Sequence, residues 1–386
     1  MDSDAISAAV DAMVPRLAAR AAEAEALRRM PDATVAEAEA AGFLGMMTPR
    51  RWGGAEAGFT AFYDATRRLA QGCPSSAWTL SFLALHCWLL CRFDPRLQEE
   101  VFAAGPAPRA PAPLAPTGKL TRVEGGFRLT GRWEWATGVM HSDWAMVTGV
   151  DPEGMGPRFC VLPIADVEIE DVWHTAGMCA TGSNTIHVRD VFVPEHRTLE
   201  AWRTKLGQTP GEAFPPGSNV GWPLNAALAL VACTPALGAA EAALEVFTRR
   251  MQEKQQAYGG GVKAAELPSI HLRLGEATAT VRAARLVWAD AIATLERIGA
   301  QGGPAANADL AAIRLAAADV VRMANVAVNN LAGAAGASSG FLTSPLQRHL
   351  RDVQMMRGHV VFDWDRAAQI GGRIALGLEP TLADLL

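Results

Sequence analysis

Two histidines occupy positions where an imidazole could act as an acid or a base. His359 ends the segment RDVQMMRGH, and His86 lies inside the apolar run AWTLSFLALHCWLLCRF. A neutral imidazole is the side chain best suited to accept a proton near pH 7. A lone histidine on a helix is nonetheless more often structural, so the role of these two depends on their neighbours. We expect Asp352 to pair with a basic residue and His349 to lie on a helix surface.

Hydroxyl-bearing turns form a second group of candidates. Thr137 and Gly138 end the strand-like segment WEWATG, and Thr181, Gly182 and Ser183 belong to the turn ATGSN. Hydroxyls and backbone N–H groups in such turns can hold a polar ligand. The same residues are good turn formers in any protein, and a strand threonine can simply bond to its neighbours. The turns alone therefore leave a ligand site and a purely structural role open.

Composition and charge restrict the partners of the chain. Half of the 386 residues are hydrophobic, 19% are charged and the net charge is -5. This balance argues against nucleic acid or an anionic membrane as a partner and favours a small-molecule substrate. The acidic, amphipathic start MDSDAISAAVDAMVPRL lacks the basic region of a signal peptide. The apolar run around His86 has about the minimum length of a membrane span, and we interpret it as a buried core helix.

The six cysteines show no paired-ligand pattern. Cys87 and Cys91 are four residues apart, a spacing that could serve a metal, but no histidine or cysteine follows at a matching interval. The sequence therefore predicts buried free thiols, no metal site and a cytoplasmic location.

The hydrophobic pattern changes twice along the chain and predicts three domains of an α+β protein. Residues 1–112 have helical periodicity. Residues 113–215 follow the Pro/Ala-rich segment AGPAPRAPAPLAPTG and alternate with period two, which predicts about eight short strands in a barrel or sandwich. Residues 216–386 contain four long Ala-rich helices, the last three over 267–300, 304–338 and 344–377, and predict a four-helix bundle.

This order of domains resembles the acyl-CoA dehydrogenase fold over nearly the whole chain. AAGFLGMMTPRRWGGAEAGFTAF resembles the N-terminal signature of that fold. GRWEWATGVMHSDWAMV resembles the strand pair that carries the flavin ring, and GMCATGSNTIHVRDVFVPEHRT resembles its companion strand. The three segments occur in the order that the fold requires.

Two further segments resemble one branch of the fold, the group D flavin-dependent monooxygenases, which include 4-hydroxyphenylacetate hydroxylase-type enzymes. They are CPSSAWTLSFLALHCWLLCRF and GASSGFLTSPLQRHLRDVQMMRGH. The dehydrogenases usually carry a catalytic glutamate near the end of the chain, whereas DVQMMRGHVVFDWDRAAQIGG contains none. The resemblance implies the oxygenase component of a two-component system. It would be a homotetramer that takes reduced FMN or FAD from a separate NAD(P)H:flavin reductase and hydroxylates an aromatic compound with O2 through a C4a-hydroperoxyflavin.

The resemblance also implies roles for individual residues. His359 would be the base that forms the reactive phenolate, and His86 would orient the phenol oxygen. Thr137 would meet the flavin N5 edge, and Arg351 would lie near the flavin phosphates across a subunit interface. The remaining residues expected at the flavin are Trp135, Ala136, Gly138, Thr181, Gly182, Ser183 and Trp173, of which Trp173 is equally well placed in the core.

Three alternatives stay open. The first is an acyl-CoA dehydrogenase that uses FAD and an unusual base, and the second is an N- or S-oxygenase of the same fold. The third is a flavin-binding scaffold without activity. The absence of a G-x-G-x-x-G fingerprint argues against a nicotinamide-binding domain but fits both an oxygenase and a dehydrogenase.

Overall fold

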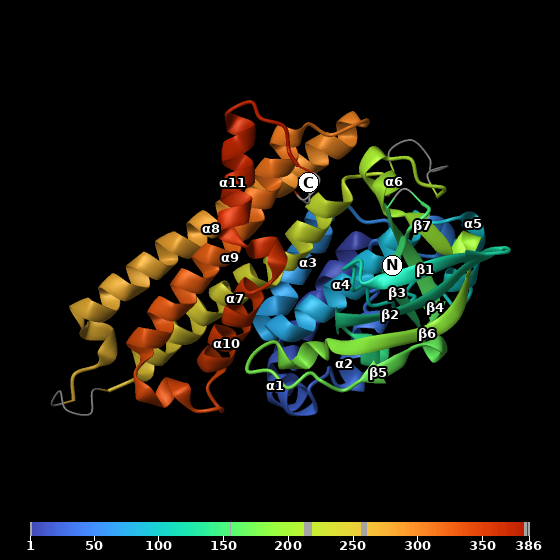
Figure 1. Cartoon of the computed structure of the whole chain (residues 1–386). Helices are drawn as coiled ribbons and strands as arrows, with labels where there is room; N and C mark the ends of the chain where they lie inside the picture. The colour runs from blue at the N-terminus through green and yellow to red at the C-terminus, as the bar shows by residue number, and fades with distance from the viewer. Residues whose placement is uncertain (1, 155, 212–217, 256–260, 382–383, 385–386) are drawn as a thin grey trace.

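The computed structural model describes residues 2–154, 156–211, 218–255, 261–381 and 384. In these ranges, N-terminal helices are followed by a sheet and then by longer helices, as the hydrophobic pattern predicts (Figure 1). The N-terminal helices are α1 (Ser3–Leu27), α2 (Asp32–Ala40), α3 (Phe59–Gly72), α4 (Pro74–Leu90) and α5 (Pro95–Phe102). The later helices are α6 (Ala201–Leu206), α7 (Leu224–Glu253), α8 (Pro268–Gln301), α9 (Asn307–Ala335), α10 (Pro345–Arg357) and α11 (Trp364–Ala375).

The described residues form one sheet of seven strands, in the order β5-β6-β2-β1-β3-β4-β7. The strands are β1 (Gly118–Val123), β2 (Gly126–Ala136), β3 (Trp144–Asp151), β4 (Gly156–Pro163), β5 (Glu168–Glu170), β6 (Asn184–Pro194) and β7 (Thr198–Glu200). Neighbouring strands are antiparallel except β1 and β3.

The seven strands in the described residues are close to the predicted number of about eight, and VEIEDVWHT forms a strand over only its Glu168–Glu170 part. After Glu170 the N–H groups of Val172 and Trp173 donate to the side-chain oxygen of Asn184, each over 3.0 Å. The chain thus leaves the sheet and turns towards the segment that precedes β6.

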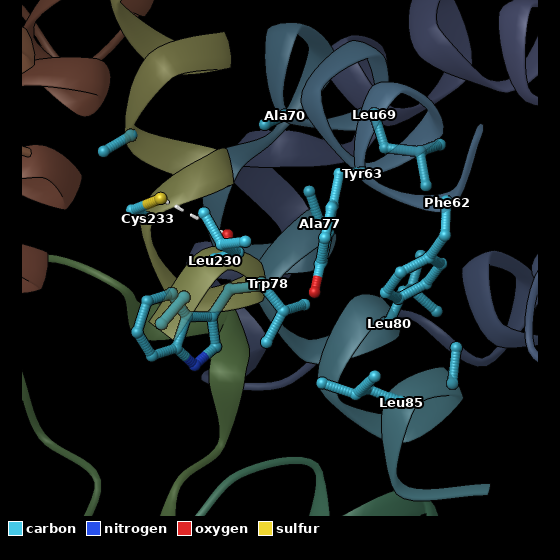
Figure 2. Packing of buried hydrophobic residues seen from close by; sticks show 14 of the residues in the cluster. Phe62, Tyr63, Leu69, Ala70, Ala77, Trp78, Leu80, Leu85, Leu230 and Cys233 are labelled. Atoms are coloured by element: carbon cyan, nitrogen blue, oxygen red, sulfur yellow. Dashed lines mark hydrogen bonds between the residues drawn. The ribbon is translucent and has the colours of Figure 1, made fainter. Parts of the chain in front are cut away.

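The core lies where α4 packs against α3 and α7 (Figures 1 and 2). Tyr63 of α3 is fully buried, and its hydroxyl donates to the Ala227 carbonyl of α7 over 3.0 Å. Nearly every residue of α4 is buried, which confirms the prediction of a core helix. All six cysteines are buried and unpaired, as predicted. Among the described helices, α7 has the length and hydropathy of a membrane span, with 83% of that stretch buried inside the protein.

The prediction of one continuous helix over 344–377 is wrong. This segment divides into α10 and α11, joined by the short 3₁₀ turn η8 (Val360–Phe362). Arg314 of α9 donates from Nη2 to the Val360 carbonyl over 3.1 Å and ties the turn to the bundle. Asp363 caps α11 by accepting the Arg366 N–H over 3.1 Å. The break places His359 at a turn rather than on a helix.

His349 is buried, so its predicted place on a helix surface is wrong. Its side chain lies on the same stripe of α10 as Leu346, Asp352, Val353 and Met356, and its residue exposure is 4%. Its Nδ1 has no hydrogen-bond partner within the described ranges. Burial lowers the pKa of His349 from 6.5 to about 4.

This burial makes His349 a source of acid sensitivity. Because the pKa is lower in the folded chain, the unfolded chain binds more protons between about pH 6.5 and pH 4, so stability falls as the pH drops through that window. His349→Leu is expected to keep the free energy of unfolding at about pH 7 and to reduce its loss on acidification by on the order of 2 kcal/mol. Urea unfolding at both ends of the window measures this difference. An equal loss of unfolding free energy on acidification in the wild type and in His349→Leu would contradict this prediction.

Candidate functional site

The candidate site is built around a chain of hydroxyl groups where β2 ends beside the 3₁₀ turn η4 (Cys179–Thr181). We call this chain, formed by Thr137, Ser183 and Thr181, the hydroxyl relay. Thr181 Oγ1 donates to the Met178 carbonyl over 2.9 Å, and Ser183 Oγ donates to Thr181 Oγ1 over 2.8 Å. Thr137 Oγ1 lies 2.9 Å from Ser183 Oγ. A carbonyl can only accept, so each hydroxyl must donate to the next one towards Met178. Thr137 Oγ1 therefore donates its hydrogen bond to Ser183 Oγ, and it can still accept a hydrogen bond from a ligand.

Two tryptophans lie beside this relay. Trp135 lies at an irregularity in the β2–β6 pairing, has a left-handed φ of 68° and is 57% exposed. Trp173 is buried, meets Trp135 edge to face at 5.3 Å between ring centroids, and donates from Nε1 to the Met178 carbonyl over 3.0 Å. Ala136 pairs with Asn184 across the strands. A strained, exposed tryptophan beside a hydroxyl edge fits a planar heterocycle such as a flavin ring.

Two glycines let the turns approach their neighbours closely. Gly138 has φ 76°, and its N–H donates to the Thr181 carbonyl over 3.0 Å, which joins the two turns. A Cβ at this position would lie 2.9 Å from Thr79 Cγ2 of α4. Gly182 also adopts the left-handed region, at φ 51°. The flavin residues predicted from the two segments thus come together against α4.

A ladder of rings on α4 leads away from this contact. Trp78, Phe82 and His86 follow one another every four residues, which places them on one face of the helix. Their ring centroids are 4.9 Å apart for Trp78 and Phe82 and 5.7 Å apart for Phe82 and His86. His359 packs edge-on against Trp78 at 5.6 Å and in a tilted arrangement against Phe362 at 5.7 Å. The two predicted histidines are thus joined through aromatic rings rather than by direct contact.

The hydrogen bonds of the two histidines require different tautomers. His86 Nδ1 lies 2.7 Å from the Ala110 carbonyl, so Nδ1 carries the proton and Nε2 is a lone-pair acceptor. His359 Nδ1 instead accepts the Val361 N–H over 3.2 Å, so in the neutral ring the proton is on Nε2. Burial lowers the pKa of each histidine from 6.5 to about 4, and the charge of Arg314 adds to the effect at His359. Both rings are neutral near pH 7, and Nε2 is an acceptor in His86 and a donor in His359.

Arg351 lies at the junction of three segments. Its Nη1 pairs with Glu25 Oε1 of α1 over 2.6 Å and donates to the Ala176 carbonyl, and its Nε donates to Gln347 Oε1 over 2.7 Å. Its Nη2 has no partner in the described part of the chain. Arg351 thus ties α10 to the loop that precedes η4, and its role at the flavin phosphates stays a prediction.

Asp352 is a site residue that the sequence interpretation placed wrongly. We expected it to pair with a basic residue, but its carboxylate accepts the Met178 N–H over 2.6 Å and the Ser75 hydroxyl over 3.2 Å. The ion-pair partner of Arg348 and Arg351 is Glu25. The signal that could have found Asp352 is its position on the buried stripe of α10. Among the described residues, no group of three or more His, Cys, Asp or Glu side chains forms a metal site.

Comparison with known proteins identifies relatives along the whole chain. Residues 2–100 match the family model for the acyl-CoA dehydrogenase N-terminal domain, and residues 230–364 match that for the C-terminal domain. The chain is 33% identical to the flavin-dependent monooxygenase oxygenase subunit HsaA of Mycobacterium tuberculosis, over 98% of this chain and 97% of HsaA. A crystal structure of HsaA from M. tuberculosis superimposes with a TM-score of 0.92 at 31% identity and covers both chains fully.

Two other relatives carry names that bear on the chemistry. The p-hydroxyphenylacetate 3-hydroxylase oxygenase component of Acinetobacter baumannii is 32% identical, over 96% of this chain and 89% of that protein. The structure of XiaF from a Streptomyces species, in complex with FADH2 and glycerol, has a TM-score of 0.91 at 28% identity and covers 98% of this chain and 97% of XiaF. These matches favour the oxygenase interpretation over the acyl-CoA dehydrogenase alternative.

Proposed function

This chain belongs to the oxygenase components of flavin-dependent monooxygenases, with the acyl-CoA dehydrogenase fold, and on that premise we propose that it hydroxylates a small phenol on the ring. The enzyme uses reduced flavin and O2, and a separate reductase supplies the flavin. The flavin provides the activated oxygen when it is bound. The residues of the chain bind and orient the two reactants, exclude water and move the phenol proton.

The observation that carries the proposal is the protonation state of His86. Its Nδ1–H is held by the Ala110 carbonyl at 2.7 Å, so Nε2 is left unprotonated in a ring that packs against Phe82 of α4. The ring carbon of a phenol attacks an electrophilic oxygen much faster when the phenol is ionised. A base that accepts the phenol proton therefore accelerates the reaction directly. We assign this step to His86 Nε2 and thereby revise the expectation that His359 is the base.

His359 has the complementary role in this proposal. Its ring packs against Trp78 and Phe362, and its Nε2–H can donate to an oxygen atom that gains negative charge. The Val361 N–H and the Arg314 contact to Val360 hold the turn that carries it. A donor fixed before the reaction begins costs no reorganisation when the charge develops.

The hydroxyl relay fits a reduced flavin. A reduced flavin carries a proton on N5, and Thr137 Oγ1 is left as an acceptor because Ser183 takes its proton. Trp135 offers an exposed apolar face for the ring, and the buried Trp173 supports it edge to face. Control of the N5 proton and exclusion of water protect the bound oxygen from loss as hydrogen peroxide.

The test is hydroxylation of simple phenols by the purified chain. A flavin reductase supplies reduced FAD or FMN in buffer equilibrated with ¹⁸O2, and the products are analysed by mass spectrometry. We expect one ¹⁸O atom in a catechol-type product, formed only when the chain is present. Products oxidised at nitrogen or sulfur, with phenols left unchanged, would contradict the aromatic assignment.

Thr137→Val is expected to uncouple oxygen consumption from product formation. Valine has nearly the same shape but cannot accept a hydrogen bond from the flavin N5–H or donate one to Ser183, so product per O2 consumed should fall about tenfold while hydrogen peroxide rises. Thr137→Ser restores the hydroxyl and should restore most of the coupling. Thr121→Val on the exposed face of β1 is the matched control and should have no effect. Unchanged coupling in Thr137→Val would exclude the proposed contact.

A further inference from the structure

The carboxylate of Asp352 is buried behind the hydroxyl relay and bonds to two different segments. The residue is 2% exposed. One oxygen accepts the Met178 N–H over 2.6 Å, and the other accepts the hydroxyl of Ser75, in the first turn of α4, over 3.2 Å. One side chain of α10 thus joins the start of α4 to the turn that precedes η4.

Met178 is the residue on which the relay depends. Its φ of 54° is left-handed, a conformation that a non-glycine residue adopts only when its surroundings hold it there. Its carbonyl accepts from Trp173 Nε1, Thr181 Oγ1 and the Thr181 N–H. This carbonyl also sets the donor direction of the whole relay. A rotation of the Met178 peptide would therefore change the hydrogen bonds of Thr181, Ser183 and Thr137.

The preceding residue packs tightly against the same helix. A Cβ at Gly177 would lie 2.2 Å from the Arg351 carbonyl oxygen, so this turn rests directly on the backbone of α10. The Asp352 bond to Met178 is one residue away from that contact. The turn is thus held by close backbone packing and by one buried carboxylate.

We propose that Asp352 is a positioning residue for flavin, which holds Met178 so that the relay presents Thr137 as an acceptor and makes the site prefer reduced over oxidised flavin. This inference rests on the proposed function. Asp352 acts through Met178, Thr181 and Ser183 and touches neither reactant. The preference follows because reduced flavin offers a proton at N5, whereas oxidised flavin offers a lone pair to an oxygen that has no proton left to give.

The surroundings of Asp352 give the preference a pH dependence. Burial raises the pKa of Asp352 from 3.8 to about 6, against the lowering effect of its hydrogen bonds and of Arg351. A small cavity beside it is lined by Glu25, Arg348, Cys73 and Cys179, among others. Burial raises the pKa of both thiols, so they stay protonated near pH 6. Glu25 stays charged there, since Arg351 and Arg348 hold its pKa low against the opposing effect of burial.

The direction of the pH effect follows from the role of the carboxylate as an acceptor. Above about pH 6 the charged Asp352 binds the Met178 N–H strongly, and below it the protonated acid is a weaker acceptor. The preference for reduced flavin should therefore be largest above about pH 6 and decline as the pH falls. Ser75→Ala removes a donor to the Asp352 carboxylate and should move the midpoint of this pH-dependent decline to higher pH.

The experiment measures the dissociation constants of reduced and oxidised FAD for the whole chain, anaerobically, from about pH 5 to pH 8. FAD is the probe because the phosphomonoester of FMN itself titrates near pH 6. N1 of reduced flavin also ionises within this range, so the contribution of Asp352 is read as the difference between the wild-type and Asp352→Asn profiles. Asp352→Ala should lower the preference for reduced FAD about tenfold or more at neutral pH. Asp352→Asn keeps an acceptor for Met178 without a titrating group, so it should keep most of the preference and lose the part of the pH dependence that Asp352 contributes.

The matched control is Asp151→Asn. Asp151 is also buried, at 3% exposure, and accepts a backbone N–H, that of Glu153 over 3.1 Å, but it lies at the end of β3. Its variant should behave as the wild type. A folded Asp352→Ala with an unchanged preference would overturn the proposal, as would Asp352→Asn with the wild-type pH midpoint. If Asp352→Ala fails to fold, the pH profiles of Asp352→Asn and Ser75→Ala test the proposal instead.

The same series separates this inference from the proposed function. Product formation from phenol by the wild type tests the function. A wild type that hydroxylates phenols while the Asp352 variants show no change refutes the positioning role alone. A wild type that binds reduced FAD without forming product refutes the proposed function.

Discussion

Replacing His86 by alanine is expected to lower kcat for phenol hydroxylation by about 10²- to 10⁴-fold, the range for loss of a general base. His86→Gln should lower kcat nearly as much, because an amide can form a hydrogen bond with the phenol but cannot remove its proton. Both variants should recover as the pH rises towards about 10, where a phenol ionises unaided. The wild-type rate should stay nearly flat over that range, since His86 is already neutral with a pKa of about 4. The measurement is kcat against pH with a fixed supply of reduced flavin.

The control for this prediction is His349→Leu, which removes another buried histidine outside the ring ladder. It should retain wild-type kcat near neutral pH. Recovery at high pH separates a lost base from a damaged fold, because a misfolded site would not regain activity. If His86→Gln kept the wild-type rate and pH profile, the assignment of the base to His86 would be wrong.

Replacing His359 by alanine is expected to lower kcat by about 10²-fold, the loss typical of one preorganised donor. Here glutamine should restore activity to within about tenfold of the wild type, because its amide N–H can occupy the position of His359 Nε2–H. No rescue by high pH is expected, since the missing group donates rather than removes a proton. Single-turnover rates with bound reduced flavin provide the comparison.

The opposite result at the two positions would exchange the roles. If His359→Gln were as inactive as His359→Ala and both recovered at high pH, His359 would be the base, as the resemblance to the family first suggested. The pair of glutamine variants therefore distinguishes the two assignments, which alanine variants alone cannot do.

The sequence predicted the three-part architecture because each part depends on local patterns. Period-two alternation indicated the sheet, and the apolar run around His86 indicated the core helix, which forms over Pro74–Leu90. The break between α10 and α11 was missed although Gly358 ends α10 and Asp363 caps α11, because the hydrophobic pattern continues across the turn. The bond from Arg314 to the Val360 carbonyl is a tertiary contact that holds the turn and could not be predicted from local patterns.

The candidate site was predictable in its residues but not in their chemistry. The motifs indicated Thr137, Ser183, His86 and His359, whereas the tautomers depend on backbone partners such as Ala110, 24 residues from His86. Asp352 was misplaced because an Arg-Asp pair in sequence suggests an ion pair, yet on a helix neighbouring residues point in different directions.

The most direct test of the central claim is rapid mixing of the anaerobic protein, loaded with reduced flavin, with oxygenated buffer. We predict a transient absorbance distinct from both reduced and oxidised flavin, which persists without substrate and decays faster when a phenol is present, with hydroxylated product formed. Reoxidation in a single step with no transient, together with bleaching of tightly bound oxidised FAD by an acyl-CoA, would contradict the account and indicate a dehydrogenase.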